Sequence, residues 1–328
     1  QPQPEARPPA GSDEALEHSM NFIRSTGDAR NLAGLQLYQR TPAWVMPRPN
    51  NPIPEGMQRV FANVPGTRAA MRAGIYWIHE AVGFAMTKQP RLLKLGELMG
   101  KWNIRRSIKD RELRRKLTPS YDFGCKRPTL SNVYYRTFNK PHVHLETAGI
   151  DRIEADGIVG ADGTKRVIDT LVLATGFDVW ESNLPAIEVI GREGRDLGKW
   201  WRENRFQAYE GLAVPLFPNM LSQASPYAWV GMSWFDTVEY QMRHMERLFG
   251  EMQRTGARTF EVTEEANARF LDRMLTLLDD SVFLLGNCAN SRSYWFNSSG
   301  EAPLFRPTTV RQAVKEQQHF PLSDYALA

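Results

Sequence analysis

The sequence predicts an α/β protein, and two stretches of the chain carry this prediction. An apolar run at residues 171–174 ends in Thr175 and Gly176, which is typical of a strand buried on both faces of a parallel sheet. Residues 57–117 are rich in helix formers and repeat apolar positions at spacings of three and four. With 328 residues and 42% hydrophobic content, the chain can bury one large domain or two ordinary ones.

The N-terminal part of the chain predicts little regular structure apart from one strand. Residues 1–30 are rich in proline, glycine, serine and aspartate, so we expect a disordered tail or remnant. Residues 35–39 (LQLYQ) predict a short buried strand. Five prolines fall within residues 41–54, and proline interrupts both helices and central strands. This stretch is therefore predicted to be an extended connection.

The predicted helical segment, residues 57–117, is interrupted by Gly66 and Pro90. Its most apolar part, residues 73–86, is too short to span a membrane. We therefore expect a buried or interfacial helix, with an apolar face formed by Ile75, Ile78, Val82 and Met86.

Short strands and then two further helices are predicted to follow. Residues 118–128 indicate a turn-rich basic loop. Strands, some joined by turns with Asp–Gly pairs, are predicted at residues 142–145, 149–154, 157–159 and 166–174. Amphipathic helices are predicted at about 235–255 and 263–278.

Composition and charge narrow the classes of function. The net charge of +4 and the pI of about 9.0 suit small anionic ligands such as nucleotides, but the cations are spread out and predict no nucleic-acid surface. The two cysteines, Cys125 and Cys288, allow one disulfide but no disulfide framework, which favours a reducing compartment. The sequence predicts neither a signal peptide nor a transmembrane span, so the expected location is the cytoplasm. It predicts no particular oligomeric state.

Two motifs place cations in segments that can bind an anion. In QRTPAW, residues 39–44, Arg40 follows a strand end and stands beside the Thr41 hydroxyl, a pairing that can hold a phosphate. In YDFGCKRP, residues 121–128, Lys126 and Arg127 follow a glycine in an irregular loop. For QRTPAW the alternative is a surface arginine that closes a strand, and for YDFGCKRP it is a solvated basic turn. For each motif, composition alone favours the alternative over an anion site.

A third motif, IDTLVLATGFD at residues 168–178, places Thr175, Gly176 and Phe177 after the predicted buried strand. The glycine allows close approach of the backbone to a ligand at the carboxyl edge of a sheet. The alternative is a core strand followed by an ordinary turn.

Two further features predict no site. His142 and His144 alternate on a predicted strand, but no third ligand accompanies them, so we expect no metal. Cys125 has cationic neighbours, which can lower the pKa of a thiol, but no catalytic partner is visible and we expect no role for it.

The order of the motifs is more specific than each motif alone. QRTPAW, then GCKRP followed by YY and FN, then IDTLVLATGFD resemble the Baeyer–Villiger monooxygenases. The later segments GLAVPLFPN, SWFDTVEYQ and SRSYWFNSSGEAPLFRP resemble one branch of the same flavin monooxygenase superfamily. The resemblance covers roughly residues 35–310.

The resemblance implies a Rossmann-like flavoprotein fold with two dinucleotide-binding domains, one for FAD and one for NADP, and a helical insertion. Residues 31–56 and 118–170 would then belong to the NADP-binding domain, and residues 57–117 to the helical insertion. Residues 171–328 would form the C-terminal part of the FAD-binding domain.

The resemblance also assigns roles to individual residues. Arg40, Thr41 and Lys126 match contacts to the 2′-phosphate of NADP. Arg127 matches the active-site arginine beside the flavin. Thr175, Gly176 and Phe177 match part of a strand that contacts FAD. Trp295, with its neighbour Tyr294, matches an aromatic position that contacts the nicotinamide cofactor or the substrate.

The implied activity uses NADPH and O₂ to insert oxygen into a ketone or to oxidise a heteroatom of a small molecule. The family requires two G-x-G-x-x-G loops, because each supplies a tight turn and a helix N-terminus for a pyrophosphate. This sequence has 24 glycines but no G-x-G triplet. We therefore expect a C-terminal portion that lacks the N-terminal FAD-binding part. The alternative is a catalytically inactive remnant with a residual nucleotide site.

Overall fold

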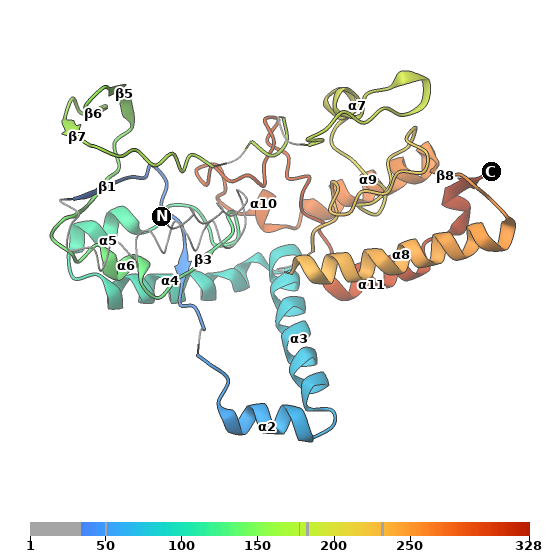
Figure 1. The fold of residues 1–328 in the computed structure, drawn as a ribbon, viewed down its shortest axis with the longest axis horizontal. Coiled ribbons are helices and arrows are strands. Elements are labelled where there is room, and N and C mark those ends of the chain that lie inside the picture. Colours follow the sequence, from blue (N-terminus) through green and yellow to red (C-terminus); the bar gives the residue numbers. More distant parts are fainter. Residues whose placement is uncertain (1–33, 50, 177, 182–183, 231–232) are drawn as a thin grey trace, which may run out of the picture. The chain divides into compact units, whose positions relative to one another are not determined.

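The computed structural model describes residues 34–328 except 50, 177, 182–183 and 231–232, and it combines helices with short strands (Figure 1). The predicted tail at residues 1–30 lies outside the described residues. The strands are β1 (Leu35–Tyr38), β2 (Val45–Met46), β3 (Thr129–Leu130), β4 (Val143–Glu146), β5 (Ile150–Glu154), β6 (Gly157–Gly160), β7 (Lys165–Val167), β8 (Phe260–Val262) and β9 (Tyr325–Leu327). The α-helices are α2 (Glu55–Asn63), α3 (Thr67–Thr87), α4 (Lys94–Ser107), α5 (Arg111–Leu117), α6 (Tyr134–Thr137), α7 (Leu197–Asn204), α8 (Trp234–Thr255), α9 (Glu264–Leu278), α10 (Val282–Leu285) and α11 (Val310–His319).

The chain divides into two compact units. Unit 1 contains residues up to 50 together with 97–120 and 128–174. Unit 2 contains residues 51–96, 121–127 and 175–328. The helical stretch 57–117 thus contributes to both units, and the domain boundaries implied by the resemblance stay a prediction.

Unit 1 is organised around two parallel strand pairs. β1 pairs with β4 in a register that runs from Leu35–Val143 to Tyr38–Glu146, and β2 pairs with β3. The strand predicted at residues 35–39 is confirmed as β1, but its residues are half-buried rather than buried. The core of unit 1 lies between these strands and the helices α4 to α6. It consists of Val45, Ile104, Ile108, Leu117, Tyr135, Phe138 and Val143.

A three-stranded antiparallel sheet, with the order β5-β6-β7, completes unit 1. At the first turn a Cβ on Gly157 would lie 2.4 Å from the carbonyl oxygen of Arg166, so only glycine fits there. At the second turn the Asp162 carboxylate accepts hydrogen bonds from the backbone N–H and the hydroxyl of Thr164, at 3.0 and 2.9 Å. Both predicted Asp–Gly turns are therefore confirmed.

The helical prediction for residues 57–117 is confirmed, and the two predicted interruptions lie where helices begin. Gly66 precedes α3 with a φ of 82°, a left-handed conformation that glycine adopts at low cost. Pro90 is the first residue of the 3₁₀ helix Pro90–Leu93, because its fixed φ suits the first helical position.

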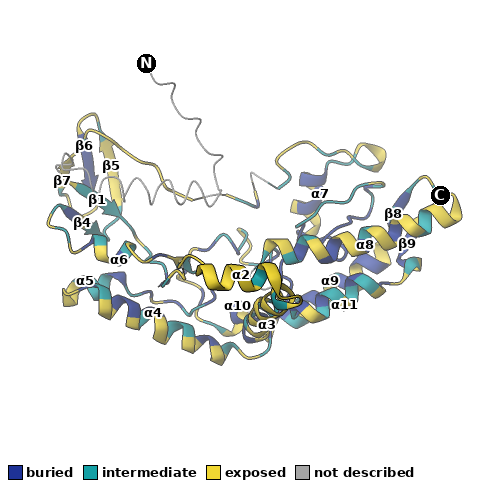
Figure 2. Cartoon of the chain, turned by 60° about the horizontal axis from the view of Figure 1, so that its bottom comes forward, coloured by how far each residue is buried: buried dark blue, intermediate teal, exposed yellow. Residues whose placement is uncertain are grey.

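Of the two alternatives expected for this helix, buried or interfacial, full burial is wrong for α3. Ile75 and Ile78 are 46% and 63% exposed, whereas Ala85 and Met86 near the end of the helix are buried. α2 has no buried residue, and most of its ribbon is in the exposed colour in Figure 2. The apolar stripe is buried only where the described chain packs against it.

The doubly buried strand predicted at residues 171–174 is not formed within the described part of the chain. Residues 168–176 pair with no described strand, and Leu171, Val172 and Leu173 are exposed. A central strand needs neighbours on both edges to pair its N–H and C=O groups. The described residues provide no such neighbours, so the predicted strand 166–174 is reduced to β7.

Unit 2 packs α8, α9 and α11 against loops rich in aromatic residues. Ser233 begins α8 by accepting a hydrogen bond from Asp236 N at 3.2 Å, and Thr263 begins α9 by accepting one from Ala266 N at 3.2 Å. Gly256 ends α8 with a φ of 73°. Both predicted helices are confirmed, because their ends are encoded by local capping residues.

A fully buried arginine links the elements of unit 2. Arg306 pairs with Glu210 at 2.6 Å and also with Glu316 on α11. Removing these charges from water is costly unless they are paired. The cluster therefore stabilises the loop at Glu210 against α11 only while all its members remain.

The stability of unit 2 should fall as the pH is lowered, because His244 is buried in neutral form. Its Nε2 lies 2.8 Å from the Tyr325 hydroxyl, its ring stacks on Phe320, and burial lowers the pKa of His244 to about 3. An unfolded histidine titrates near 6.5. Below that pH the unfolded state binds a proton that the folded state does not, so stability present above pH 6.5 is lost down to about pH 3.

At pH 5 this linkage should lower the free energy of unfolding by about 2 kcal/mol relative to pH 7. Urea unfolding at several pH values measures it, and His244→Gln should remove this part of the pH dependence. An unchanged pH slope in the variant would contradict the assignment.

Candidate functional site

Arg40 and Thr41 lie at the carboxyl end of β1, which is the edge of parallel strands where α/β proteins bind ligands. Gln39 fixes this end of the strand, because its N–H donates to the Glu146 carbonyl at 2.9 Å and its Oε1 accepts from the Tyr134 hydroxyl at 3.0 Å. Arg40 is exposed and forms no ion pair with any described residue. Its guanidinium is thus available to an anion.

The residues that follow anchor this segment in the core of unit 1. Trp44 is buried, and a Cβ on Gly100 of α4 would lie 2.6 Å from Cε3 of its ring. The Asn103 side chain donates to the Val45 carbonyl at 2.9 Å. The close approach of α4 therefore holds the backbone that leads from Arg40 to β2.

Lys126 and Arg127 belong to the loop 121–127, which is part of unit 2. Lys126 is half-buried, and this burial lowers the pKa of its ammonium group. Arg127 is exposed, and across the described chain neither cation pairs with a carboxylate. A partly desolvated cation without a counterion favours binding of an anion.

Thr175 and Gly176 lie on the exposed stretch after residue 174, and Phe177 lies outside the described residues. Gly176 has a φ of 97°, a conformation that side chains rarely adopt. The chain can therefore present its backbone closely to a ligand at this point. The predicted sheet edge around it is absent from the described residues, for the reason given for residues 171–174.

Trp295 lies inside an aromatic cluster rather than at an open surface. Its ring centroid is 4.5 Å from that of Trp229 and 5.4 Å from that of Phe283, and 2% of the residue is exposed. Its indole N–H has no hydrogen-bond partner among the described residues. Tyr294 beside it is half-buried and therefore more accessible. A cofactor contact by Trp295 stays a prediction.

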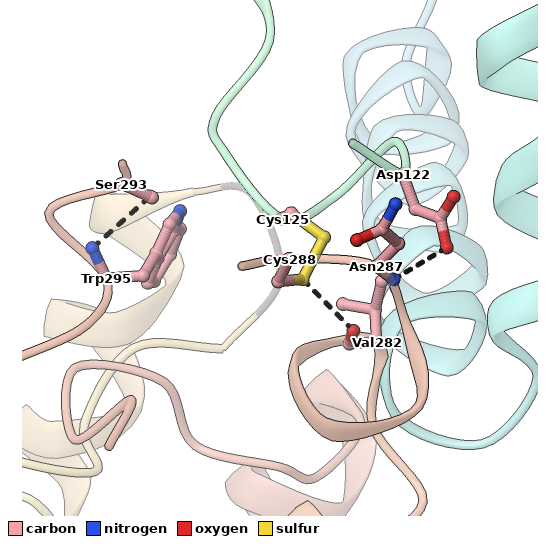
Figure 3. Close-up of a disulfide and its surroundings, with 7 residues drawn as sticks. All are labelled: Asp122, Cys125, Val282, Asn287, Cys288, Ser293 and Trp295. Carbon is pink, nitrogen blue, oxygen red and sulfur yellow. Dashed lines mark hydrogen bonds between the residues drawn. A yellow bond between two sulfur atoms is a disulfide. The ribbon is translucent and has the colours of Figure 1, made fainter. Parts of the chain in front are cut away.

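A covalent link that the sequence allowed but did not predict lies next to the basic loop. Cys125 and Cys288 form a disulfide with a Cα–Cα distance of 5.1 Å (Figure 3). The expectation that Cys125 has no role is therefore wrong, and the pairing runs against the preference for a reducing compartment. The only sequence feature that pointed to this disulfide was the presence of two cysteines, which allow a single pairing.

The described residues contain no group of three or more histidine, cysteine or acidic side chains that could hold a metal ion. Over the same residues, no helix combines the length and the apolar character needed to cross a bilayer.

Parallel strands with Arg40 at their carboxyl edge, and a separate basic loop whose cations pair with no described carboxylate, define the protein as one of the α/β class. No family model matches the sequence. A Baeyer–Villiger monooxygenase from Pseudomonas aeruginosa is 34% identical over 258 residues, which are 78% of this chain and 49% of the relative. A Baeyer–Villiger monooxygenase from Streptomyces coelicolor is 32% identical over 295 residues, which are 89% of this chain and 56% of the relative.

Solved structures show the same fold. The closed crystal structure of cyclohexanone monooxygenase matches with a TM-score of 0.75 at 21% identity, over 93% of this chain and 64% of that one. The OTEMO complex with FAD and NADP matches with a TM-score of 0.73 at 21% identity, over 92% of this chain and 63% of that one. The chain belongs to the Baeyer–Villiger-type flavin monooxygenases, and it spans about half the length of the curated relatives it matches.

Gly100→Ala should destabilise unit 1 by about 1–3 kcal/mol, because the added Cβ forces Trp44 or α4 to move. The matched control is Gly74→Ala on α3, where a Cβ meets nothing within 4 Å. Alanine favours a helix interior over glycine by about 0.5–1 kcal/mol, so the control should be neutral or stabilising. Urea unfolding compares the two, and equal effects would show that Trp44 does not pack closely on α4.

Proposed function

We propose that this chain is part of an FAD- and NADPH-dependent monooxygenase that inserts oxygen beside a ketone carbonyl or oxidises a heteroatom of a small molecule. The observation that carries this proposal is the loop with Lys126 and Arg127. It presents two adjacent cations, one half-buried and one exposed, that no described carboxylate neutralises. The relatives named Baeyer–Villiger monooxygenase support the reaction class.

The chain alone does not fit FAD. A flavin dinucleotide needs a glycine-rich turn and a helix N-terminus for its pyrophosphate, and the sequence has no G-x-G triplet. The stretch with Thr175 and Gly176 lacks strand neighbours within the described residues. We propose that the Rossmann-like arrangement of two dinucleotide-binding domains requires further strands beside residues 171–174, whose exposed apolar side chains support this.

The residues at the end of β1 fit the phosphate of NADP. A 2′-phosphate is a compact anion that a guanidinium and a hydroxyl bind by charge-assisted hydrogen bonds, and Arg40 and Thr41 provide both at an exposed strand end. The resemblance assigns Lys126 to the same group, and its partial burial without a counterion among the described residues supports binding of an anion. When bound, NADPH supplies the hydride that the reaction consumes.

Arg127 is the candidate catalytic residue. Oxygen insertion beside a carbonyl places negative charge on oxygen, and a positioned cation stabilises such charge. A guanidinium stays protonated at any working pH, so Arg127 can hold this charge without giving up a proton. Its exposure and its lack of a carboxylate partner within the described chain leave it open to a ligand.

A residual nucleotide-binding remnant without activity is the second candidate function. The absence of a G-x-G triplet and the exposed residues 171–173 favour it for the chain on its own. In that case the cations would still bind a phosphate, but no oxygenated product would form.

Nucleotide binding to the chain itself tests the phosphate contacts. We expect Arg40→Ala and Lys126→Ala, each measured singly, to weaken binding of 2′,5′-ADP by about 10- to 150-fold, since a hydrogen bond to a charged group contributes about 1.5–3 kcal/mol. Binding of 5′-AMP, which has no 2′-phosphate, should change little. Isothermal titration calorimetry measures both ligands, with the exposed Arg136→Ala as control. Equal losses for both nucleotides would indicate a structural role.

Fusion to the part of the Pseudomonas aeruginosa relative that this chain does not match should restore flavin binding, whereas the chain alone should purify colourless. In the fused protein, Arg127→Ala should lower the rate of ketone oxygenation by about 10²–10³. NADPH oxidation should continue, with its electrons released to O₂ as hydrogen peroxide. The ratio of product to NADPH consumed measures this, with exposed Arg258→Ala as control. An unchanged ratio would remove Arg127 from the catalytic site.

A further inference from the structure

The loop that carries Lys126 and Arg127 is attached to unit 2 by its first five residues. The chain leaves unit 1 after residue 120, contributes residues 121–127 to unit 2, and returns to unit 1 at residue 128. Within this loop Cys125 is fully buried and bonded to Cys288, which is also buried (Figure 3).

A second attachment lies next to the disulfide. The Asp122 carboxylate accepts a hydrogen bond from Asn287 N at 2.9 Å, and Asp122 N donates to the Asn287 carbonyl at 3.3 Å. Cys125 N donates in turn to the Asp122 carbonyl at 3.2 Å. Residues 122–125 thus form one turn that is held to residues 287–288 by two hydrogen bonds and one covalent bond.

Glycine permits this close packing. Gly124 has a φ of 103°, and a Cβ there would lie 3.0 Å from Leu93 Cδ1 and 3.4 Å from Val282 Cγ2. The turn is therefore pressed against the start of α10. Cys288 Sγ lies 3.3 Å from the Val282 carbonyl oxygen, and because a disulfide sulfur has no proton, this contact becomes a hydrogen bond only in the thiol state.

Between Cys125 and β3, the side chains of the two cations have no polar partner among the described residues. Neither Lys126 nor Arg127 forms a hydrogen bond or an ion pair with a described residue. On the other side of Arg127, Pro128 has a fixed φ, and Thr129 N donates to the Trp44 carbonyl at 2.9 Å at the start of β3. The position of Arg127 therefore depends on Cys125 two residues before it and on Thr129 two residues after it. The other end of the bridge restrains the segment that leads to Trp295, because Ser291 N donates to the Cys288 carbonyl at 2.9 Å.

We propose that the Cys125–Cys288 disulfide and Asp122 are positioning residues for Arg127, and that reduction of the disulfide releases the basic loop and lowers oxygenation. A dithiol reductant supplies two electrons and two protons, the S–S bond breaks, two thiols form, and the reductant becomes a cyclic disulfide. This inference rests on the proposed function of Arg127, but the release of the loop can be measured without it.

Trypsin cleavage between Lys126 and Arg127 reports the release in the chain itself, because the bond after Arg127 precedes proline and resists trypsin. We expect dithiothreitol to expose two thiols and to raise cleavage at this bond at least 10-fold, measured by mass spectrometry. Only two cysteines exist, so the thiol count is unambiguous. Cys125→Ser with Cys288→Ser should be cleaved rapidly with or without the reductant. Asp122→Ala should keep the disulfide and show an intermediate rate.

Three outcomes would overturn the proposal. These are two free thiols that no oxidant pairs, equal cleavage in both redox states, and a rise shared by tryptic sites throughout the chain, which would mean general unfolding. In the fused enzyme, reduction should lower the ratio of product to NADPH consumed and raise the KM for NADPH, because Lys126 lies in the released loop, and the double serine variant should not respond. A fused enzyme that makes no product in either state, although the loop is released, would support the positioning of the loop and overturn the proposed function instead.

Discussion

The hydrogen bonds between β1 and β4 are the interaction on which the rest of unit 1 depends. They join residues 35–38 to residues 143–146 in parallel, and no tight turn can make that connection. The intervening chain must leave the strand pair and return, and the helices are therefore found between β1 and β4 in the sequence. The same pairing brings Arg40 to the carboxyl edge beside the end of β4. One backbone interaction thereby sets both the topology and the position of a candidate phosphate contact.

Backbone pairing also explains where the chain departs from the structure that its pattern predicts. Residues 171–174 have the apolar side chains of a central strand, yet they are exposed because no described strand lies beside them. The apolar stripe at the start of α3 is exposed for a related reason, since burial requires a covering surface and periodicity only selects the face to be covered. Both features accompany a chain that spans about half the length of its curated relatives.

The cations of this chain differ in their partners. Arg306 is fully buried, and two carboxylates neutralise it, so it stabilises unit 2. Arg40, Lys126 and Arg127 pair with no carboxylate in the described structure, so they are open to ligands. Sequence alone favoured a surface role for Arg40 and a basic turn for Lys126 and Arg127. The difference between Arg306 and the other three cations depends on Glu210 and Glu316. These carboxylates lie far from Arg40 and Lys126 in the chain and meet Arg306 only in the folded protein.

The sequence by itself determined what depends on neighbouring residues: the strand at 35–38, the Asp–Gly turns, the helix interrupted at Gly66 and Pro90, and the order of motifs that identifies the family. Only the tertiary structure decided the Cys125–Cys288 bond, the hydrogen bonds of Asp122 to Asn287, the burial of Trp295 and the exposure of residues 171–173. The physical reason is the range of the interactions. Propensity and periodicity act over one helical turn or one strand, whereas a disulfide, a buried ion pair or a strand neighbour depends on which distant segments the chain path brings together.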